Sequence, residues 1–208
     1  IYTLGDTLSL HDALPICRPI GKHFVITRAE QNVIYELGGK PAVIQLHELL
    51  VRLPMREQEM VRRGLHLGRA VSEYKDRFEH GDFLVRNVLG VDPDTGAVVV
   101  SDYVRVGQTV KFHIRDAQTA DADLRQLLAA ARERMDGNPL GALLFTCNGR
   151  GTRMFPEPHH DAAAIGRVWG EIPLAGCFAA GELGPVGGKN FVHGFTASIA
   201  LFEAITES

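Results

Sequence analysis

The sequence is poor in cysteine, in long apolar runs and in charge of a single sign. Its three cysteines are widely spaced and odd in number, which excludes a disulfide framework and favours a reducing cytosol. No apolar stretch approaches the roughly 18 to 20 residues that cross a bilayer. The net charge is −3 with both signs interspersed, so no nucleic-acid footprint and no polybasic membrane patch is present. We therefore expect a cytoplasmic protein that binds neither nucleic acid nor membrane.

Standard motifs for phosphate and metal binding are lacking as well. The segment CNGRG (147–151) has no Lys-Ser/Thr of a P-loop, and GELGPVGG (181–188) lacks the strand–helix context of a dinucleotide fingerprint. Adjacent histidines such as His159 and His160 rarely bind one ion from regular structure, and no C-x₂-C spacing occurs. We interpret the two histidines as a solvated loop before a helix, with Asp161 as its cap or first-turn acid.

The remaining pattern mixes strands and helices without strict alternation, which predicts an α+β fold with largely antiparallel sheets. Helices are expected after Pro41, after Pro54 up to Gly64, from about Thr119 with Asp121 and Asp123 in its first turn, and over about 160–169. Strands are expected at 23–29 and 33–37, a hairpin, then at 65–72, 82–92, 96–104, 109–116, 142–146, 174–180 and 192–202. The last segment can also continue as a helix.

The segment LLFTCNGRGTRMF (143–155) is the first candidate site, because a buried strand there enters a polar, glycine-rich turn. As a nucleophile, Cys147 needs a base, for which His193, Glu182 and Asp161 are available. Free cysteines are usually buried, so we favour a small apolar residue at a strand end.

Glu182 is the second candidate, since it lies between small apolar residues and a Gly-Pro turn. If buried, it needs a partner such as Arg150 or His193. One interpretation is an internal Glu182–Arg150 pair that fixes the loops. The other is a polar cavity in which Arg150 binds a ligand carboxylate and Glu182 accepts from an amine. Sequence alone leaves both open.

Six ordered segments together resemble the C-terminal domain of the FIST family. They are GDFLVRNVLGVDPDTGAV, GQTVKFHIRDAQTADADL, GALLFTCNGRGTRMF, HHD, PLAGCFAAGELGPVGG and FVHGFTASIALF. The resemblance implies a non-enzymatic sensory domain of bacterial signal transduction that binds a small molecule, with amino acids as one suggested class. It also implies signalling partners such as a histidine kinase or a cyclic-dinucleotide enzyme.

Carried over by motif, the signature positions imply a ligand site. They are Cys147, Asn148, Gly149, Arg150, Glu182, His193, Phe195 and Thr196. No cofactor is expected. The alternative is a haem-based nitric oxide sensor, for which His193 is the axial ligand to test because haem iron needs a strong donor. A cysteine-dependent enzyme is a further alternative.

The N-terminal stretch is interpreted separately. Residues 7–16, TLSLHDALPI, resemble one reading frame of a sequencing adapter, an artefact found at the ends of metagenomic reading frames. We therefore expect residues 1–16 to be a non-native leader, 17–40 the end of the FIST N-terminal domain or the junction, and 41–208 the FIST C-terminal domain. On this interpretation the natural protein is truncated at its N-terminus.

Overall fold

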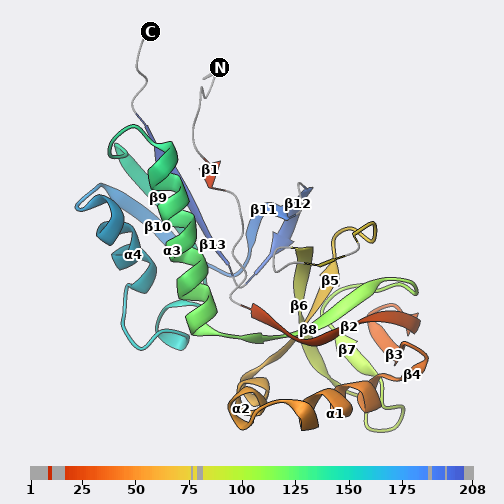
Figure 1. Cartoon of the computed structure of the whole chain (residues 1–208). Helices are drawn as coiled ribbons and strands as arrows, with labels where there is room; N and C mark the ends of the chain where they lie inside the picture. The colour runs from red at the N-terminus through yellow and green to blue at the C-terminus, as the bar shows by residue number, and fades with distance from the viewer. Residues whose placement is uncertain are drawn as a thin grey trace. The chain divides into compact units, whose positions relative to one another are not determined.

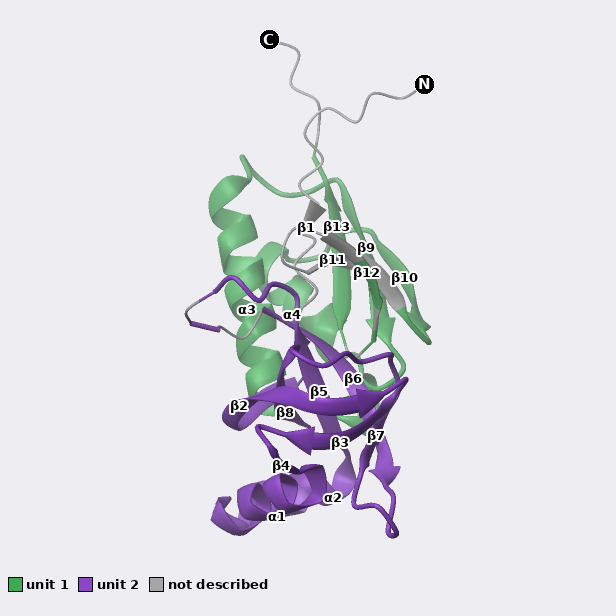
Figure 2. Ribbon diagram, turned by 90° about the vertical axis from the view of Figure 1, so that its right-hand side faces the viewer, with its two compact units in different colours: residues 1–16, 117–208 green, residues 17–116 purple. Residues whose placement is uncertain are grey.

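The computed structural model describes residues 9–10, 17–75, 77–78, 82–186, 189–194 and 196–203, and these fall into two compact units. Unit 1 comprises residues 1–16 and 117–208, and unit 2 comprises residues 17–116 (Figure 2). Both units combine helices with mainly antiparallel strands, which confirms the predicted α+β class. Within the described ranges, no helix is both long and apolar enough to cross a membrane.

Unit 2 is a closed antiparallel barrel. Its strands are β2 (Cys17–Glu30), β3 (Val33–Leu37), β4 (Lys40–Pro41), β5 (Leu65–Ala70), β6 (Phe83–Val91), β7 (Val98–Val100) and β8 (Thr109–Arg115). They follow the order β2-β8-β5-β6-β7-β3-β4, and a further β2–β3 pairing closes the ring. The long β2 makes closure possible, since residues 17–25 pair with β8 and residues 26–30 pair with β3.

Two helices follow the predicted β2–β3 hairpin, which turns at Gln31 with a φ of 52°. They are α1 (Ala42–Arg52) and α2 (Met55–Arg63), separated at Pro54 as the sequence predicts. Leu46 and Leu49 on α1 belong to the same buried cluster as barrel residues such as Phe112. The hydrophobic face of α1 is therefore buried in the core of unit 2.

Unit 1 is a sheet with helices α3 (Ala117–Arg134) and α4 (His160–Trp169). Its strands, in spatial order, are β1 (Ser9–Leu10), β13 (Ala197–Phe202), β9 (Gly141–Cys147) and β10 (Leu174–Ala179). β10 runs parallel to β9, and α4 lies between them in sequence, so this part is a βαβ crossover. β11 (Glu182–Val186) and β12 (Lys189–His193) form a separate hairpin (Figure 1).

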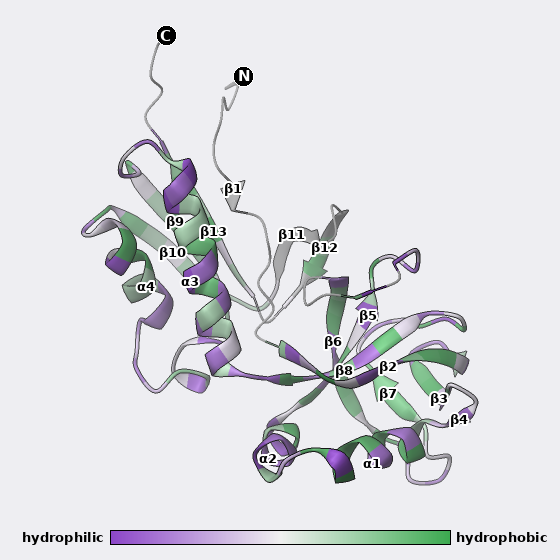
Figure 3. Ribbon diagram, in the orientation of Figure 1, coloured by the Kyte–Doolittle hydropathy of each residue, from purple (hydrophilic) through white to green (hydrophobic). Residues whose placement is uncertain are grey.

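The core of unit 1 lies between the sheet and the two helices. Alternate residues of β9 and β13 point to this side, among them Leu144 and Ile199, which are opposite each other in register. They pack with Leu128 of α3 and Trp169 of α4. In Figure 3, β9 is coloured mostly as hydrophobic, whereas α3 shows both hydrophilic and hydrophobic turns, as expected for a helix with one buried face.

Three expectations about this unit are wrong. The segment 192–202 is not one strand, because β12 ends at His193 and β13 starts at Ala197. The expected Gly-Pro turn after Glu182 is not found either, because Gly184 and Pro185 lie within β11 (Glu182–Val186). Pro185 is compatible with β11 because the hairpin is two-stranded and each strand has an unpaired edge. α3 begins at Ala117, so Asp121 lies beyond its first turn.

Candidate functional site

The backbone of unit 1 brings three of the signature segments to one end of the sheet. Cys147 is the last residue of β9, and its N–H donates to the carbonyl of Thr196, 3.0 Å away. The N–H of Asn148 donates to the carbonyl of Ala179 at the end of β10, at 2.8 Å. Because β9 and β10 are parallel and β13 is antiparallel to β9, the ends of two strands and the start of the third meet here.

The CNGRG segment turns tightly after β9. The N–H of Arg150 donates to the carbonyl of Cys147 at 2.9 Å, and the N–H of Gly149 contacts the Cys147 Sγ at 3.3 Å. Gly151 has a φ of 62°, and a Cβ there would lie 3.1 Å from the ring of Phe178. Both its backbone angle and its close approach to that ring therefore favour glycine at this position.

Arg150 forms a buried, two-pronged ion pair with Asp161. Its Nε donates to Asp161 Oδ2 at 2.8 Å and its Nη2 to Oδ1 at 2.6 Å, and the two side chains are 1% and 6% exposed. The guanidinium also lies over the Phe155 ring, 5.2 Å from its centroid. The carboxylate that Arg150 contacts is therefore Asp161, which lies in the first turn of α4 as its sequence position predicts.

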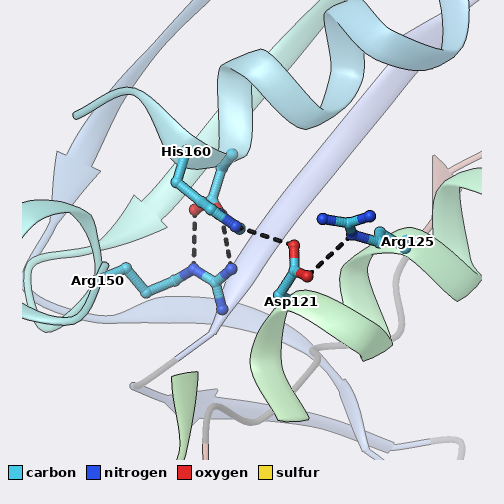
Figure 4. Close-up of polar contacts among 5 residues, drawn as sticks. Asp121, Arg125, Arg150 and His160 are labelled. Atoms are coloured by element: carbon cyan, nitrogen blue, oxygen red, sulfur yellow. Dashed lines mark hydrogen bonds and ion pairs between the residues drawn. The ribbon is translucent and has the colours of Figure 1, made fainter. Parts of the chain in front are cut away.

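His160 extends this pair into a network (Figure 4). Its Nδ1 lies 3.0 Å from Asp161 Oδ1 and its Nε2 lies 2.9 Å from Asp121 Oδ1 on α3. Asp121 also pairs with Arg125, one helical turn further along α3. The His160 ring stacks on Phe155, so the prediction of a solvated histidine loop is wrong for His160, while His159 is exposed.

The network lowers the pKa of its carboxylates. Burial alone would raise the pKa of Asp161, but the hydrogen bonds and charges of Arg150 and His160 outweigh it and hold this pKa below its ordinary value. The pKa of Asp121 is lowered in the same way, with Arg125 and His160 opposing the effect of burial. Both carboxylates are therefore ionised at neutral pH, and the network joins α3, α4 and the CNGRG turn through charged hydrogen bonds.

A pocket of about 400 Å³ lies beside this network, between β10, the end of β9 and the start of α4. Most of its wall is apolar, and the apolar lining consists of Leu144, Gly151, Ala162, Leu174, Ala175, Gly176 and Phe178. Polar lining residues are Thr146, His159, His160, Asp161 and Cys177. Cys177 is the exposed member of the three free cysteines, whereas Cys17 and Cys147 are buried.

The predicted site residues stand in different places relative to this pocket. Cys147, Arg150 and Thr196 are buried, and none of them lines it. Asn148 is exposed, and Gly149 belongs to the turn. The backbone of Glu182 pairs with that of His193 in the β11–β12 hairpin. The side chains of Glu182 and His193, and all of Phe195, lie outside the described part of the chain, so those predictions stay predictions.

Sequence reasoning missed most of the pocket residues. Thr146 precedes the CNGRG motif by one position, and Phe178 and Cys177 lie on a strand read only as apolar. The HHD segment (159–161) was the available signal, but we interpreted it as a solvated loop before a helix, with Asp161 as a cap or first-turn acid, and not as part of a binding pocket. Among the described residues, no group of three His, Cys, Asp or Glu side chains is arranged to hold a metal ion.

Comparisons with known proteins agree with the motif resemblance. Residues 42–185 match the family model of the FIST C domain, and residues 10–40 match that of the FIST N domain. An uncharacterised protein of Mycobacterium tuberculosis is 52% identical over 186 residues, which is 89% of this chain and 49% of that protein. An uncharacterised protein of Mycobacterium bovis is 49% identical over 186 residues, 89% of this chain and 48% of that protein. The chain thus spans about half the length of the curated relatives it matches.

Proposed function

Because the chain belongs to the FIST family, a family of sensory domains in signal transduction, we propose that it senses a small ligand and that the ligand binds in the pocket of unit 1. The observation that carries the proposal is the pocket itself, an apolar concavity with a few polar groups at one side. Its volume of about 400 Å³ falls within the range typical of small-molecule sites.

The surroundings of the pocket suit a sensor. Asp161 and His160 line it, and the same side chains contact Arg150 of the CNGRG turn and Asp121 of α3. A ligand that touches the start of α4 therefore acts on a helix that is tied to two other elements by charged hydrogen bonds. A ligand shifts such an arrangement only as far as it binds one form better than another.

The proposal is for binding without catalysis. The Cys147 thiol is buried, accepts from the Gly149 N–H and does not line the pocket. Cys177 is the exposed cysteine, and its pairing with Phe145 places its side chain on the sheet face opposite Leu144 and Thr146. Among the described residues no base contacts it. These contacts favour a structural role for Cys147 over that of a nucleophile, which needs a base within hydrogen-bonding reach.

We place the protein in the cytoplasm and expect an output such as a histidine kinase or a cyclic-dinucleotide enzyme, as the family resemblance implies. Amino acids are one ligand class within this proposal. In the curated relatives the matched region is about half of the protein, so the output and the response of the full-length protein remain part of the proposal.

Haem binding through His193 remains the alternative. Of the two histidines that line the pocket, His160 has both ring nitrogens within 3.0 Å of carboxylate oxygens, so neither is free to bind iron. A haem-loaded spectrum with a Soret band that is lost in His193→Ala would replace the present proposal with this one.

A metabolite screen by thermal shift tests the proposal, with a larger side chain at Ala162 used to fill the pocket. Ala162 lines the pocket, whereas its neighbour Ala163 is exposed and does not line it, so Ala163→Phe is the matched control. Genuine ligands should raise the Tm of the wild type and of Ala163→Phe, but not of Ala162→Phe. Hits that shift Ala162→Phe as much as the wild type, or no hits at all with the fold intact, contradict the proposal.

A further inference from the structure

The start of α4 offers unused hydrogen-bond donors to the pocket. The first backbone bond of this helix runs from the Ala163 N–H to the His159 carbonyl, at 2.8 Å. The three preceding amides, those of His160, Asp161 and Ala162, therefore have no partner within the helix, and no side chain caps its N-terminus. All three residues line the pocket.

Thr146 provides a second, independent donor in the same pocket. This residue is 4% exposed and lines the pocket from β9, on the face that carries Leu144. Among the described residues no hydrogen bond of its hydroxyl is found, and this oxygen is not one of the fully enclosed side-chain atoms without a partner. The hydroxyl is therefore accessible from the pocket, where it can donate to an acceptor on a ligand.

We infer that the pocket binds a carboxylate with an apolar tail, held by the Thr146 hydroxyl and the free amides at the start of α4. Helix N-termini favour negative charge through their free N–H groups and their dipole. The tail would contact the apolar wall formed by Leu144, Leu174 and Phe178. This inference rests on the proposed function and narrows its ligand class.

The same pocket disfavours an α-amino group on the ligand. Asp161 provides the one carboxylate in the pocket lining that the structure describes, and both of its oxygens are engaged. Oδ1 accepts from Arg150 Nη2 and contacts His160 Nδ1, and Oδ2 accepts from Arg150 Nε. An ammonium group in the pocket would lose water without gaining a free carboxylate.

Matched ligand pairs test the inference by isothermal titration calorimetry on the 208-residue chain. The acids are 3-phenylpropionate and 4-methylpentanoate, each compared with its primary amide and with its α-amino counterpart, L-phenylalanine or L-leucine. The acids should bind at least about tenfold more tightly than either comparison compound, because a hydrogen bond to a charged group is worth more than one to a neutral group.

A pair of Thr146 variants locates the carboxylate. Thr146→Val removes the hydroxyl at constant shape and should weaken binding of the acids about tenfold, and binding of the amides by a smaller factor. Thr146→Ser keeps the hydroxyl and should restore binding. The fluorescence of Trp169, the single tryptophan, which is buried in unit 1, reports whether each variant is folded.

The outcomes separate this inference from the proposed function. Equal affinity for acid and amide, or tighter binding of the amino acids, overturns the inference and leaves a pocket ligand of other chemistry. Failure of both acids to bind also overturns it, and the proposed function survives only if the metabolite screen gives hits that Ala162→Phe abolishes and Ala163→Phe does not.

Discussion

At the residue scale, the arrangement around Arg150 decides how the start of α4 is held. Arg150 is 2% exposed, and a buried guanidinium is tolerated only when it is paired. Both carboxylate oxygens of Asp161 accept hydrogen bonds from the Arg150 guanidinium, and the Phe155 ring lies against that guanidinium. The pair fixes the first turn of α4, whose residues His160 to Ala162 line the pocket.

Replacing Arg150 by methionine should destabilise unit 1 by about 3 kcal/mol, because it leaves the buried Asp161 carboxylate without its main partner. The double variant Arg150→Met/Asp161→Leu should recover much of this loss, since neither charge remains. Urea unfolding followed by Trp169 fluorescence measures both. Arg153→Met, an exposed arginine three positions away, is the control and should change stability by less than about 0.5 kcal/mol. A loss as small as that of the control would contradict the role given to the pair.

The sequence predicted that Arg150 needs a carboxylate but not which one. An arginine beside a buried strand needs a carboxylate partner. Which carboxylate it finds depends on how α4 packs against the CNGRG turn. Glu182 was the obvious candidate because of its apolar neighbours, and Asp161 had an ordinary local explanation as a helix-terminal acid. Tertiary contacts of this kind leave no local pattern in the chain.

At the element scale, β10 depends on a glycine opposite Leu144. A Cβ at Gly176 would overlap the carbonyl oxygen of Leu144, a backbone atom of the neighbouring β9. The parallel pairing of β9 and β10 that forms one wall of the pocket therefore requires glycine at this position.

Two glycine-to-alanine variants in unit 1 should have opposite effects. Gly176→Ala should destabilise the unit by more than about 2 kcal/mol, because the backbone of β9 or β10 must move. Gly166→Ala, on the exposed face of α4 with nothing within 4 Å of the new Cβ, should stabilise it by about 0.5 to 1 kcal/mol. Thermal unfolding followed by Trp169 fluorescence compares them. A Gly176→Ala protein as stable as the wild type would show that the strand spacing is looser than described.

Elements with a strong local pattern were predictable, and those fixed by pairing were not. The helical spacing of α1, the prolines at 41 and 54 and the period of β5 to β8 give their positions closely. The pairing of residues 17–25 of β2 with β8, and that of β13 with β9, depend on partners far along the chain. The order of strands in a sheet is likewise not encoded by periodicity.

At the scale of the whole molecule, the two units respond differently to acid. Burial, with the charge of Arg115, lowers the pKa of His66 in the barrel to about 4. Its imidazole is neutral in the folded unit, and the unfolded chain takes up its proton from about pH 6.5 downward. In unit 1 the pKa of Asp161 is lowered, so its stabilising contribution is present above about pH 4 and lost only below that.

Acidification should therefore weaken unit 2 first. Between about pH 6.5 and 4 the barrel should lose on the order of 3 kcal/mol through His66, whereas Asp161 costs unit 1 stability only as the pH falls below about 4. Hydrogen exchange of peptides from 17–116 and 117–203, measured at both pH values and corrected for intrinsic rates, reports each unit. His66→Gln should remove the loss in the barrel. A barrel whose protection is the same at pH 6.5 and pH 4 would contradict this assignment.

The family boundary does not coincide with the boundary between the units. Residues matched to the FIST N domain supply β2, β3 and β4 of the barrel, and residues matched to the FIST C domain supply its other strands. The pocket lies wholly in unit 1. The sensing site proposed here is thus contained within residues 144–178 of the chain.

The most direct test of that claim is an NMR titration of the ¹⁵N-labelled chain with 3-phenylpropionate. Saturable shifts should appear at the amides of His160, Asp161, Ala162 and Thr146, the residues that line the pocket next to the proposed carboxylate position. Barrel amides should remain unchanged. Saturable shifts confined to residues 17–116, or no saturable shift anywhere in the folded protein, would contradict the assignment of this pocket as the sensing site.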